Sequence, residues 1–287
     1  RLRGVPMDPD GMNMDELERA LKEEPNARFI YTIPNFQNPS GITMSWEKRQ
    51  AMYALAKKYG VLILEDNPYG DLRFSGEHVP PIKSLDEDGL VVYCGSFSKV
   101  ISPGIRVGYA IAPQTLLQKM IVCKQGEDVH TNIWSQLVCN ELMTKYDFDA
   151  HLERLRTIYR EKSAFTMKLL DEHLVPHGVT YLPIEGGLFL WCTLPDGVDM
   201  PAFCKEAVLR KVCVVPGNAF LTGLGHVDEA SGEVQRPFGR LFGAAAHQQL
   251  VALVQYQGDG GGRGVEVVDE TAVGALLRLL VMNFEMG

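Results

Sequence analysis

Cysteine is scarce in this 287-residue chain, and no two of its six cysteines form a C-x-x-C pair. The chain therefore lacks the usual pattern of a thiol redox motif or of a cysteine zinc site. Because most of the cysteines stand in apolar runs such as VVYC and LWC, we expect reduced core residues. His173 and His177 have the spacing of helical zinc ligands, but Pro176 lies between them. No glutamate stands where a metalloprotease needs one, so we predict no metal site.

Clusters of positive charge and long apolar runs are also missing. The formal net charge is -8, and the 28 lysines and arginines are scattered, which excludes an extended basic surface for nucleic acid. No apolar run approaches the roughly 18 residues that a membrane helix needs. The first ten residues, RLRGVPMDPD, lack the apolar centre of a signal peptide. We therefore expect a cytoplasmic protein without a membrane or nucleic-acid partner.

The chain begins at Arg1 instead of a methionine, and a pattern typical of the middle of an α/β domain follows almost at once. We therefore expect a fragment or a processed piece of a longer protein. Hydrophobic residues make up 46% and charged residues 22%, which is the composition of an ordinary globular protein with a sizeable core.

Helical and strand patterns alternate in the first half. Met14, Leu17 and Leu21 recur at helical spacing, and the strand RFIYTI follows. Ser45 and Gly60 are suitable first and last caps of a second helix. The runs VLILED and LVVYC are continuously apolar, which is typical of parallel strands buried on both faces. We predict an α/β fold with a mostly parallel sheet covered by helices on both sides.

The pattern changes near Asp149, where a long amphipathic helix begins and continues to Pro176 and Gly178. We place the domain boundary there, with an incomplete large domain at 1–148 and a small C-terminal domain at 149–287. Two strands around a glycine turn are expected in VTYLPIEGGLFLWCTL, a helix in PAFCKEAVLRKV and a short strand in CVVPG. These elements predict an α+β domain, with a glycine-rich linker at 257–264.

Polar residues follow each apolar run of the predicted sheet: PNFQNPSG, DNPYGD and GSFSKVISPGIRVG. Ligands of open parallel sheets bind at the carboxyl ends of the strands. The set of residues that pyridoxal phosphate requires is present in Lys99, Asp66 and Arg106. Arg106 stands seven residues after Lys99. The lysine forms a Schiff base, the aspartate keeps the pyridine ring protonated, and the arginine binds the phosphate.

Four motifs in this order, NPSG at 38–41, DNPYG at 66–70, SFSK at 96–99 and R-x-G at 106–108, resemble those of the class I and II aminotransferases. The resemblance extends to about residue 245 and is greatest to the aminoadipate, kynurenine and aromatic amino acid branch. It implies fold type I, a pyridoxal 5'-phosphate cofactor and a homodimer. It also implies that Lys99 is the catalytic lysine and that Asp66 is the partner of the ring nitrogen. Tyr69 and Asn38 would bind the phenolic oxygen of the cofactor, and Ser96, Ser98 and Arg106 would bind its phosphate.

The distal segment RPFGRLFG resembles the place where the family binds the substrate α-carboxylate, which makes Arg240 the candidate together with Asn38. Arg236 competes with Arg240, and a plain surface arginine is the alternative. The stretch from Pro183 to Trp191 resembles a family segment that approaches the substrate. After Arg240 the sequence departs from the family pattern.

The resemblance implies a ping-pong transfer of an amino group from an L-amino acid to a 2-oxo acid, with broad specificity. One alternative is the pyridoxal phosphate-sensing domain of a transcription regulator. The chain retains Asn38 and the D-x-x-Y spacing, which those regulators tend to alter, and this favours an enzyme. A second alternative is an inactive truncated fragment, since the family's N-terminal arm, phosphate loop and ring-stacking aromatic do not appear before Arg1.

Overall fold

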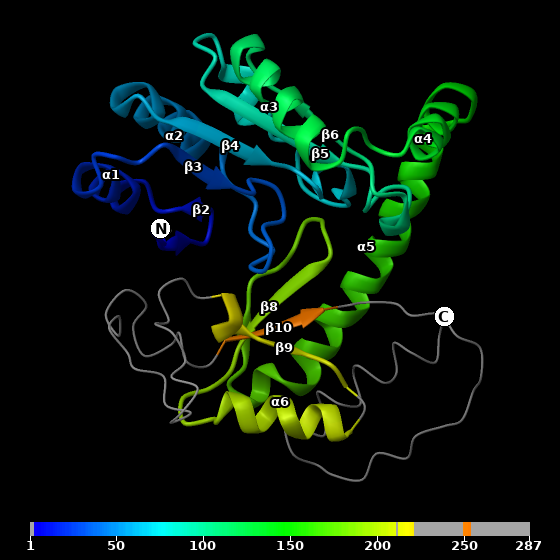
Figure 1. The fold of residues 1–287 in the computed structure, drawn as a ribbon. Coiled ribbons are helices and arrows are strands. Elements are labelled where there is room, and N and C mark those ends of the chain that lie inside the picture. Colours follow the sequence, from blue (N-terminus) through cyan, green and yellow to red (C-terminus); the bar gives the residue numbers. More distant parts are fainter. Residues whose placement is uncertain (1–2, 211, 221–248, 254–287) are drawn as a thin grey trace, which may run out of the picture.

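The computed structural model describes residues 3–210, 212–220 and 249–253. The described residues form two four-stranded sheets and a small two-stranded one, and one long helix passes beside both larger sheets (Figure 1). Arg236, Arg240 and the glycine-rich stretch at 257–264 lie outside the described residues.

The first sheet has the order β3-β4-β5-β6. Strands β3 (Phe29–Thr32), β4 (Leu62–Asp66) and β5 (Val91–Ser96) are parallel, and β6 (Gly108–Ile111) runs antiparallel to β5 at the edge. The mostly parallel α/β sheet predicted from the sequence is thus confirmed. Because parallel strands end on the same side, the polar segments after β3, β4 and β5 share one edge.

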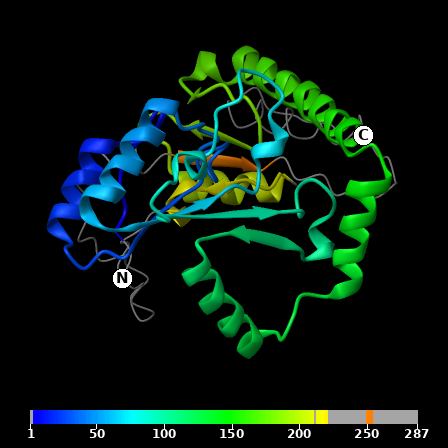
Figure 2. The same ribbon diagram turned by 90° about the horizontal axis from the view of Figure 1, so that it is seen from above.

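Helices α1 (Met14–Glu23) and α2 (Trp46–Tyr59) pack together beside one face of this sheet (Figure 2). Ser45 caps α2 by accepting the backbone N–H of Lys48, and Gly60 ends the helix in the left-handed conformation at φ 65°. Both caps agree with the sequence prediction. A hairpin of β1 (Met7–Asp8) and β2 (Gly11–Met12) precedes α1. The core between the helices and the sheet includes Met52, Ala56, Ile63 and Val91.

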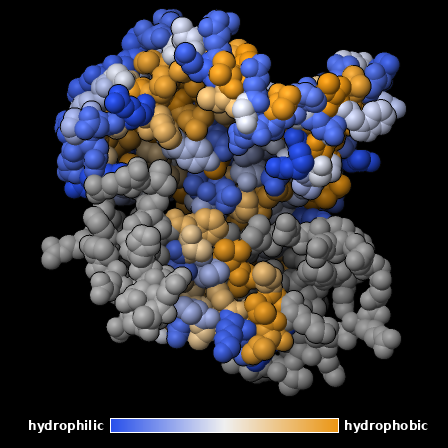
Figure 3. Space-filling model, viewed as in Figure 1, coloured by the Kyte–Doolittle hydropathy of each residue, from blue (hydrophilic) through white to orange (hydrophobic). Residues whose placement is uncertain are grey.

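Among the described residues, helices bury one face of this sheet more fully than the other. Along β4 buried positions alternate with half-buried ones, and Phe29 and Tyr31 of β3 are 53% and 49% exposed. Helix α3 (Gln114–Glu127) buries no residue, and α4 (Ile133–Lys145) buries only Cys139. Apolar side chains are accordingly visible on the surface of this region (Figure 3). Strand composition reports how apolar a face is, but the covering layer has to come from another part of the chain.

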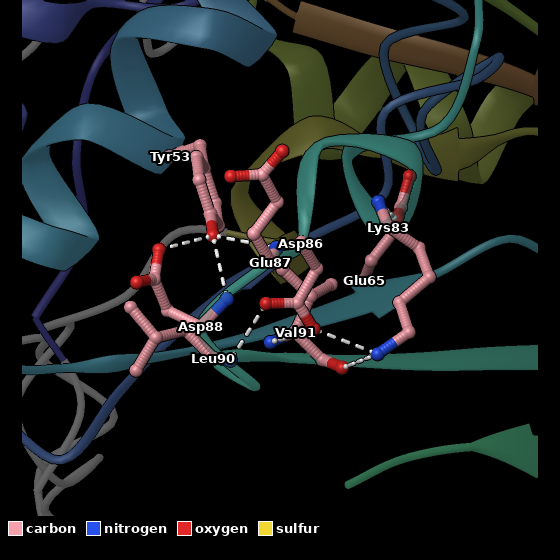
Figure 4. Close-up of polar contacts among 8 residues, drawn as sticks. All are labelled: Tyr53, Glu65, Lys83, Asp86, Glu87, Asp88, Leu90 and Val91. Atoms are coloured by element: carbon pink, nitrogen blue, oxygen red, sulfur yellow. Dashed lines mark hydrogen bonds and ion pairs between the residues drawn. The ribbon is translucent and has the colours of Figure 1, made fainter.

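The amino end of β5 is fixed by a compact set of polar contacts (Figure 4). Asp86 accepts the backbone N–H groups of Leu90 and Val91 and pairs with Lys83 at 2.7 Å. Tyr53 of α2 donates its hydroxyl hydrogen to Asp88 at 2.7 Å. The short helix η2 (Ile82–Leu85) therefore holds β5 in place at the end opposite to the polar segments.

Helix α5 (Phe148–His173) leads to the second sheet, whose order is β7-β8-β10-β9 and whose pairs are all antiparallel. Its strands are β7 (Thr180–Tyr181), β8 (Phe189–Thr193), β9 (Val215–Pro216) and β10 (Gln249–Leu253). Helix α6 (Met200–Leu209) and α5 share a core with β8. The two strands around a glycine turn and the following helix thus form as predicted. The domain boundary at 148/149 stays a prediction.

The cysteines only partly match the expectation of core residues. Cys139, Cys192 and Cys204 are buried and Cys94 is half-buried, but Cys123 and Cys213 are exposed. For these two the prediction was wrong, because an apolar run on a helix or loop surface does not guarantee burial. In the described part of the chain, no helix has the length and hydrophobicity needed to cross a membrane.

Candidate active site

Asp66 is the last residue of β4, and its carboxylate is on the sheet face opposite to α2 because the preceding Glu65 is fully buried on the helix side. Its Oδ2 atom accepts a hydrogen bond from the hydroxyl of Tyr31 at 2.8 Å. Burial and the Asp66 carboxylate raise the pKa of the Tyr31 phenol, so this group remains a hydrogen-bond donor at neutral pH. Asp66 thus stands at the carboxyl edge of the sheet as an oriented negative charge.

Asn38 and Tyr69 come together from the segments that follow β3 and β4. The Asn38 side chain lies close enough to the Tyr69 hydroxyl to lower the pKa of that phenol. Burial and the nearby Asp66 charge raise the pKa of Tyr69 by more than the Asn38 side chain lowers it. The buried Tyr69 ring packs edge-on against Phe189 of β8, with ring centroids 5.3 Å apart. These contacts bring an amide and a phenol close to Asp66.

Lys99 lies in the turn that follows β5 and is half-buried. In the same turn Ser96 Oγ accepts the backbone N–H of Ser98 at 3.1 Å, and Arg106 Nη1 lies 3.5 Å from Ser98 Oγ. Arg106 follows the short helix η3 (Pro103–Ile105) and has the left-handed φ of 54°, which turns the chain back toward Ser98. Two hydroxyls and a guanidinium therefore flank the lysine, which is a suitable set for a phosphate.

The stretch from Pro183 to Trp191 reaches this edge from the second sheet. Phe36, two residues before Asn38, is fully buried and lies against Gly186 and Gly187. A Cβ atom added at Gly186 would lie 2.3 Å from the Phe36 ring, and one added at Gly187 would lie 2.5 Å from the Phe36 Cβ. The glycine pair therefore allows the second sheet to press on the segment that carries Asn38.

A buried polar network beneath the site was not predicted from the sequence. Arg49 of α2 is fully buried and donates to Asn35 Oδ1 at 2.7 Å, and Asn35 donates to Asn67 Oδ1 at 2.9 Å. Asn67 then donates to the Tyr93 hydroxyl at 2.7 Å. Burial lowers the pKa of Arg49 to about 10, so the guanidinium remains charged at neutral pH. An arginine in an otherwise core-facing helix position is the one sequence signal that could have indicated this network.

Comparison with known proteins supplies the family. The family model for aminotransferase class I and II matches residues 4–247. The chain belongs to the class I and II aminotransferases. This membership confirms the fold type I architecture and the pyridoxal phosphate cofactor that the sequence resemblance implied.

Individual aminotransferases of this family agree with the predicted branch. Aromatic-amino-acid aminotransferase 1 of Thermococcus litoralis is 41% identical over 220 residues, which are 75% of this chain and 52% of that protein. The solved structure of the α-aminoadipate aminotransferase LysN of Thermus thermophilus, complexed with N-(5'-phosphopyridoxyl)-L-leucine, superposes on this chain with a TM-score of 0.76 at 31% identity. The match covers 99% of this chain and 65% of LysN. The uncharacterized HTH-type transcriptional regulator YisV of Bacillus subtilis is 31% identical over 77% of this chain and 45% of its own length. The chain spans about half the length of the curated relatives it matches.

The donor groups at the sheet edge fit the cofactor of this family. A carboxylate suits a protonated ring nitrogen, the phenol and amide pair suits a phenolic oxygen, and two hydroxyls with a guanidinium suit a phosphate. These groups and the turn that carries Lys99 lie at the same edge of the sheet, and Lys99 is the one lysine in the three polar segments. The role of Arg240 stays a prediction, since that residue lies outside the described part of the chain.

Proposed function

We propose that the full-length protein containing this chain is a pyridoxal phosphate-dependent aminotransferase that moves an amino group from an L-amino acid to a 2-oxo acid. One observation carries the proposal. Asp66, the Asn38 and Tyr69 pair, and the chain from Ser96 to Arg106, which includes Lys99, lie at the carboxyl edge of three parallel strands.

The bound cofactor would supply an electron sink for the carbanion at the substrate α-carbon. The Lys99 amine would hold the cofactor covalently and, once displaced by substrate, would carry the α-proton on Nζ. Asp66 would keep the ring nitrogen protonated, and Tyr69 with Asn38 would bind the phenolic oxygen. Ser96, Ser98 and Arg106 would anchor the phosphate.

The absorbance spectrum of the full-length protein with pyridoxal phosphate tests this proposal. We expect a visible band that an amino acid bleaches, and we expect the band and turnover to disappear in Lys99→Ala. Lys119→Ala is the matched control, because Lys119 is an exposed lysine of α3. A Lys99→Ala protein that still turns over would refute the assignment of the lysine.

The substrate proposal is narrower. Relatives named for aromatic amino acids, 2-aminoadipate and kynurenine support a broad-range enzyme of that branch. A single apolar pocket separates substrates by only about 1 to 3 kcal/mol per methylene, so overlapping activities are expected. Measuring kcat/KM for an aromatic amino acid, 2-aminoadipate and kynurenine with one 2-oxo acid would rank them. A preference of several thousandfold for one substrate would contradict broad specificity.

The match to a transcription regulator supports a second candidate, a domain that binds pyridoxal phosphate without transamination. The two functions differ in the first half-reaction. An aminotransferase mixed with an amino acid releases a stoichiometric 2-oxo acid, whereas a sensing domain retains its visible band and releases none. A homodimer, which the family resemblance implies, and a cytoplasmic location, which the composition suggests, complete the proposal.

A further inference from the structure

Tyr31 occupies a special place next to Asp66. It lies on β3 opposite Leu64 of β4, and Asp66 is two residues farther along β4 on the same face. The Tyr31 side chain extends diagonally toward the carboxyl edge and ends in the 2.8 Å hydrogen bond to Asp66 Oδ2. On the other side of Asp66, Cys94 of β5 is its ladder partner. The carboxylate is thus flanked by a phenol and a thiol.

The charge on Asp66 has no cationic partner among the described side chains, because none of the ion pairs there involves it. The hydrogen bond from Tyr31 is the one that the structure records for this carboxylate, and it uses Oδ2. Oδ1 is left for another donor. A protonated ring nitrogen is the donor that the proposed function would bring to this position.

We propose that Tyr31 is a positioning residue that fixes the Asp66 carboxylate so that its second oxygen faces the ring nitrogen of the cofactor. The inference rests on the proposed function. The phenol restricts rotation of the carboxylate and satisfies one oxygen in a region that is partly shielded from water. Removing the hydroxyl leaves Asp66 in place but free to turn.

Tyr31→Phe in the full-length protein tests the role. We expect the dissociation constant of pyridoxal phosphate to rise and kcat to fall, each about 3- to 10-fold, with KM for the 2-oxo acid changed less than twofold. With ¹⁵N-labelled cofactor, the ring-nitrogen resonance should move toward that of an unprotonated pyridine. A merely structural role for Tyr31 would lower the thermal midpoint without moving this resonance.

Tyr53→Phe is the matched control. It removes another phenol-to-carboxylate hydrogen bond, that to Asp88 at 2.7 Å, at the opposite end of the sheet (Figure 4). This variant should lose stability and retain the wild-type cofactor affinity and nitrogen resonance. Equal effects of the two variants on the resonance, or none from Tyr31→Phe, would overturn the proposal.

A cofactor-free measurement separates this inference from the proposed function. Burial raises the pKa of the Tyr31 phenol most, and the Asp66 carboxylate raises it further. In the ultraviolet titration of the tyrosines, Asp66→Asn should therefore lower the pKa of one late-ionising phenol in part, because the contribution of the carboxylate is lost and that of burial remains. No change in the titration would overturn the inference even if the protein binds pyridoxal phosphate. If Asp66→Asn changes the titration but the wild-type protein binds no cofactor, the result would instead contradict the proposed function, and with it the cofactor role of Tyr31.

Discussion

Two adjacent acidic residues at the end of β4 have opposite surroundings. Glu65 is fully buried and accepts the backbone N–H groups of Ile82 and Lys83 at 2.9 and 2.8 Å. Burial raises the pKa of Glu65, and these hydrogen bonds together with Arg49 offset only part of that effect. Asp66 faces the other side, where Tyr31 is its partner. One residue therefore holds η2 on the sheet, while the next is available for a ligand.

Asp66→Asn should lower turnover roughly 100-fold or more, because a neutral amide no longer stabilises a protonated ring nitrogen. Glu65→Gln is the matched control. Its amide can accept only one of the two backbone N–H groups, so we expect a loss of about 1 to 2 kcal/mol in the free energy of unfolding with the visible band retained. Steady-state kinetics, the cofactor spectrum and urea unfolding measure the two effects. Similar turnover in both variants would count against the role of Asp66.

The Asp86 carboxyl group makes the free energy of unfolding depend on pH. Burial alone raises the pKa of this carboxyl, but the Lys83 ammonium and the N–H groups of Leu90 and Val91 together outweigh burial and hold the pKa below its ordinary value. The folded state thus binds this proton less tightly than the unfolded chain. The resulting stability is present above about pH 4 and is lost as the pH falls through the folded-state pKa.

Asp86→Asn should therefore cost about 2 kcal/mol of unfolding free energy at pH 7, since an amide cannot accept both N–H groups and also pair with Lys83. The difference between variant and wild type should shrink at pH 3. Urea unfolding at the two pH values measures it. A difference of the same size at both would mean that the carboxylate charge is not responsible.

At the scale of elements, the ends of α2 depend on local chemistry. Gly60 has a φ of 65°, and a Cβ added there would meet no atom within 4 Å. Gly60→Ala should cost about 1 kcal/mol of unfolding free energy from backbone strain alone. Gly126→Ala is the matched control, because Gly126 is helical, has no positive φ and also has open space around its Cβ. That change should leave stability equal or raise it by up to about 1 kcal/mol, as thermal or urea unfolding would measure. A loss of the same size in both variants would exclude strain at Gly60 as the cause.

Elements that depend on local residues can be predicted from the sequence, whereas elements that depend on distant partners cannot. Helix α2 is predictable because Ser45 and Gly60 lie within its own turns. Helices α3 and α4 have too few buried residues for a one-sided apolar pattern, so periodicity does not mark them. Strand β10 pairs with β8 and β9, and those partners lie far away in the sequence. Pairing of that kind depends on the whole fold.

The candidate site divides in the same way. Asp66 ends β4, and Asn38 and Lys99 lie in the segments after β3 and β5. All three belong to short motifs, so the sequence identifies them. Tyr31 lies within β3, and its contact with Asp66 depends on the register between β3 and β4. Arg49 reaches the site only because α2 packs beside the sheet. Contacts that require two elements in register are not visible in one segment.

At the scale of the whole molecule, the two sheets meet through a few specific contacts. Arg73 pairs with Glu185 at 2.6 Å and lies over the Phe36 ring at 4.9 Å from its centroid. Arg160 of α5 donates to the carbonyl oxygen of Phe74 at 2.8 Å. These contacts join the segment after β4 to the long helix and to the glycine pair before β8. The position of Asn38 therefore depends on both sheets.

A double-mutant cycle of Arg73→Ala and Glu185→Ala tests this connection. The pair is partly exposed, so we expect a coupling of about 0.5 to 1 kcal/mol in unfolding free energy that decreases with added salt. If the pair holds the glycine segment against Phe36, each single variant should also weaken cofactor binding about twofold to fivefold. Lys145 and Glu141 of α4 form the control pair, with 2.8 Å between Nζ and Oε2.

That control pair should show a similar or smaller coupling in stability and leave cofactor binding unchanged, since α4 contributes no residue to the candidate site. Coupling in stability without any change in cofactor affinity would mean that the contact between the sheets is structural only. A change in affinity that is absent from the control pair would instead show that the second sheet sets the position of Asn38. Because Gly186 and Gly187 leave no room for displacement toward Phe36, movement of the second sheet should be transmitted directly to the segment that carries Asn38.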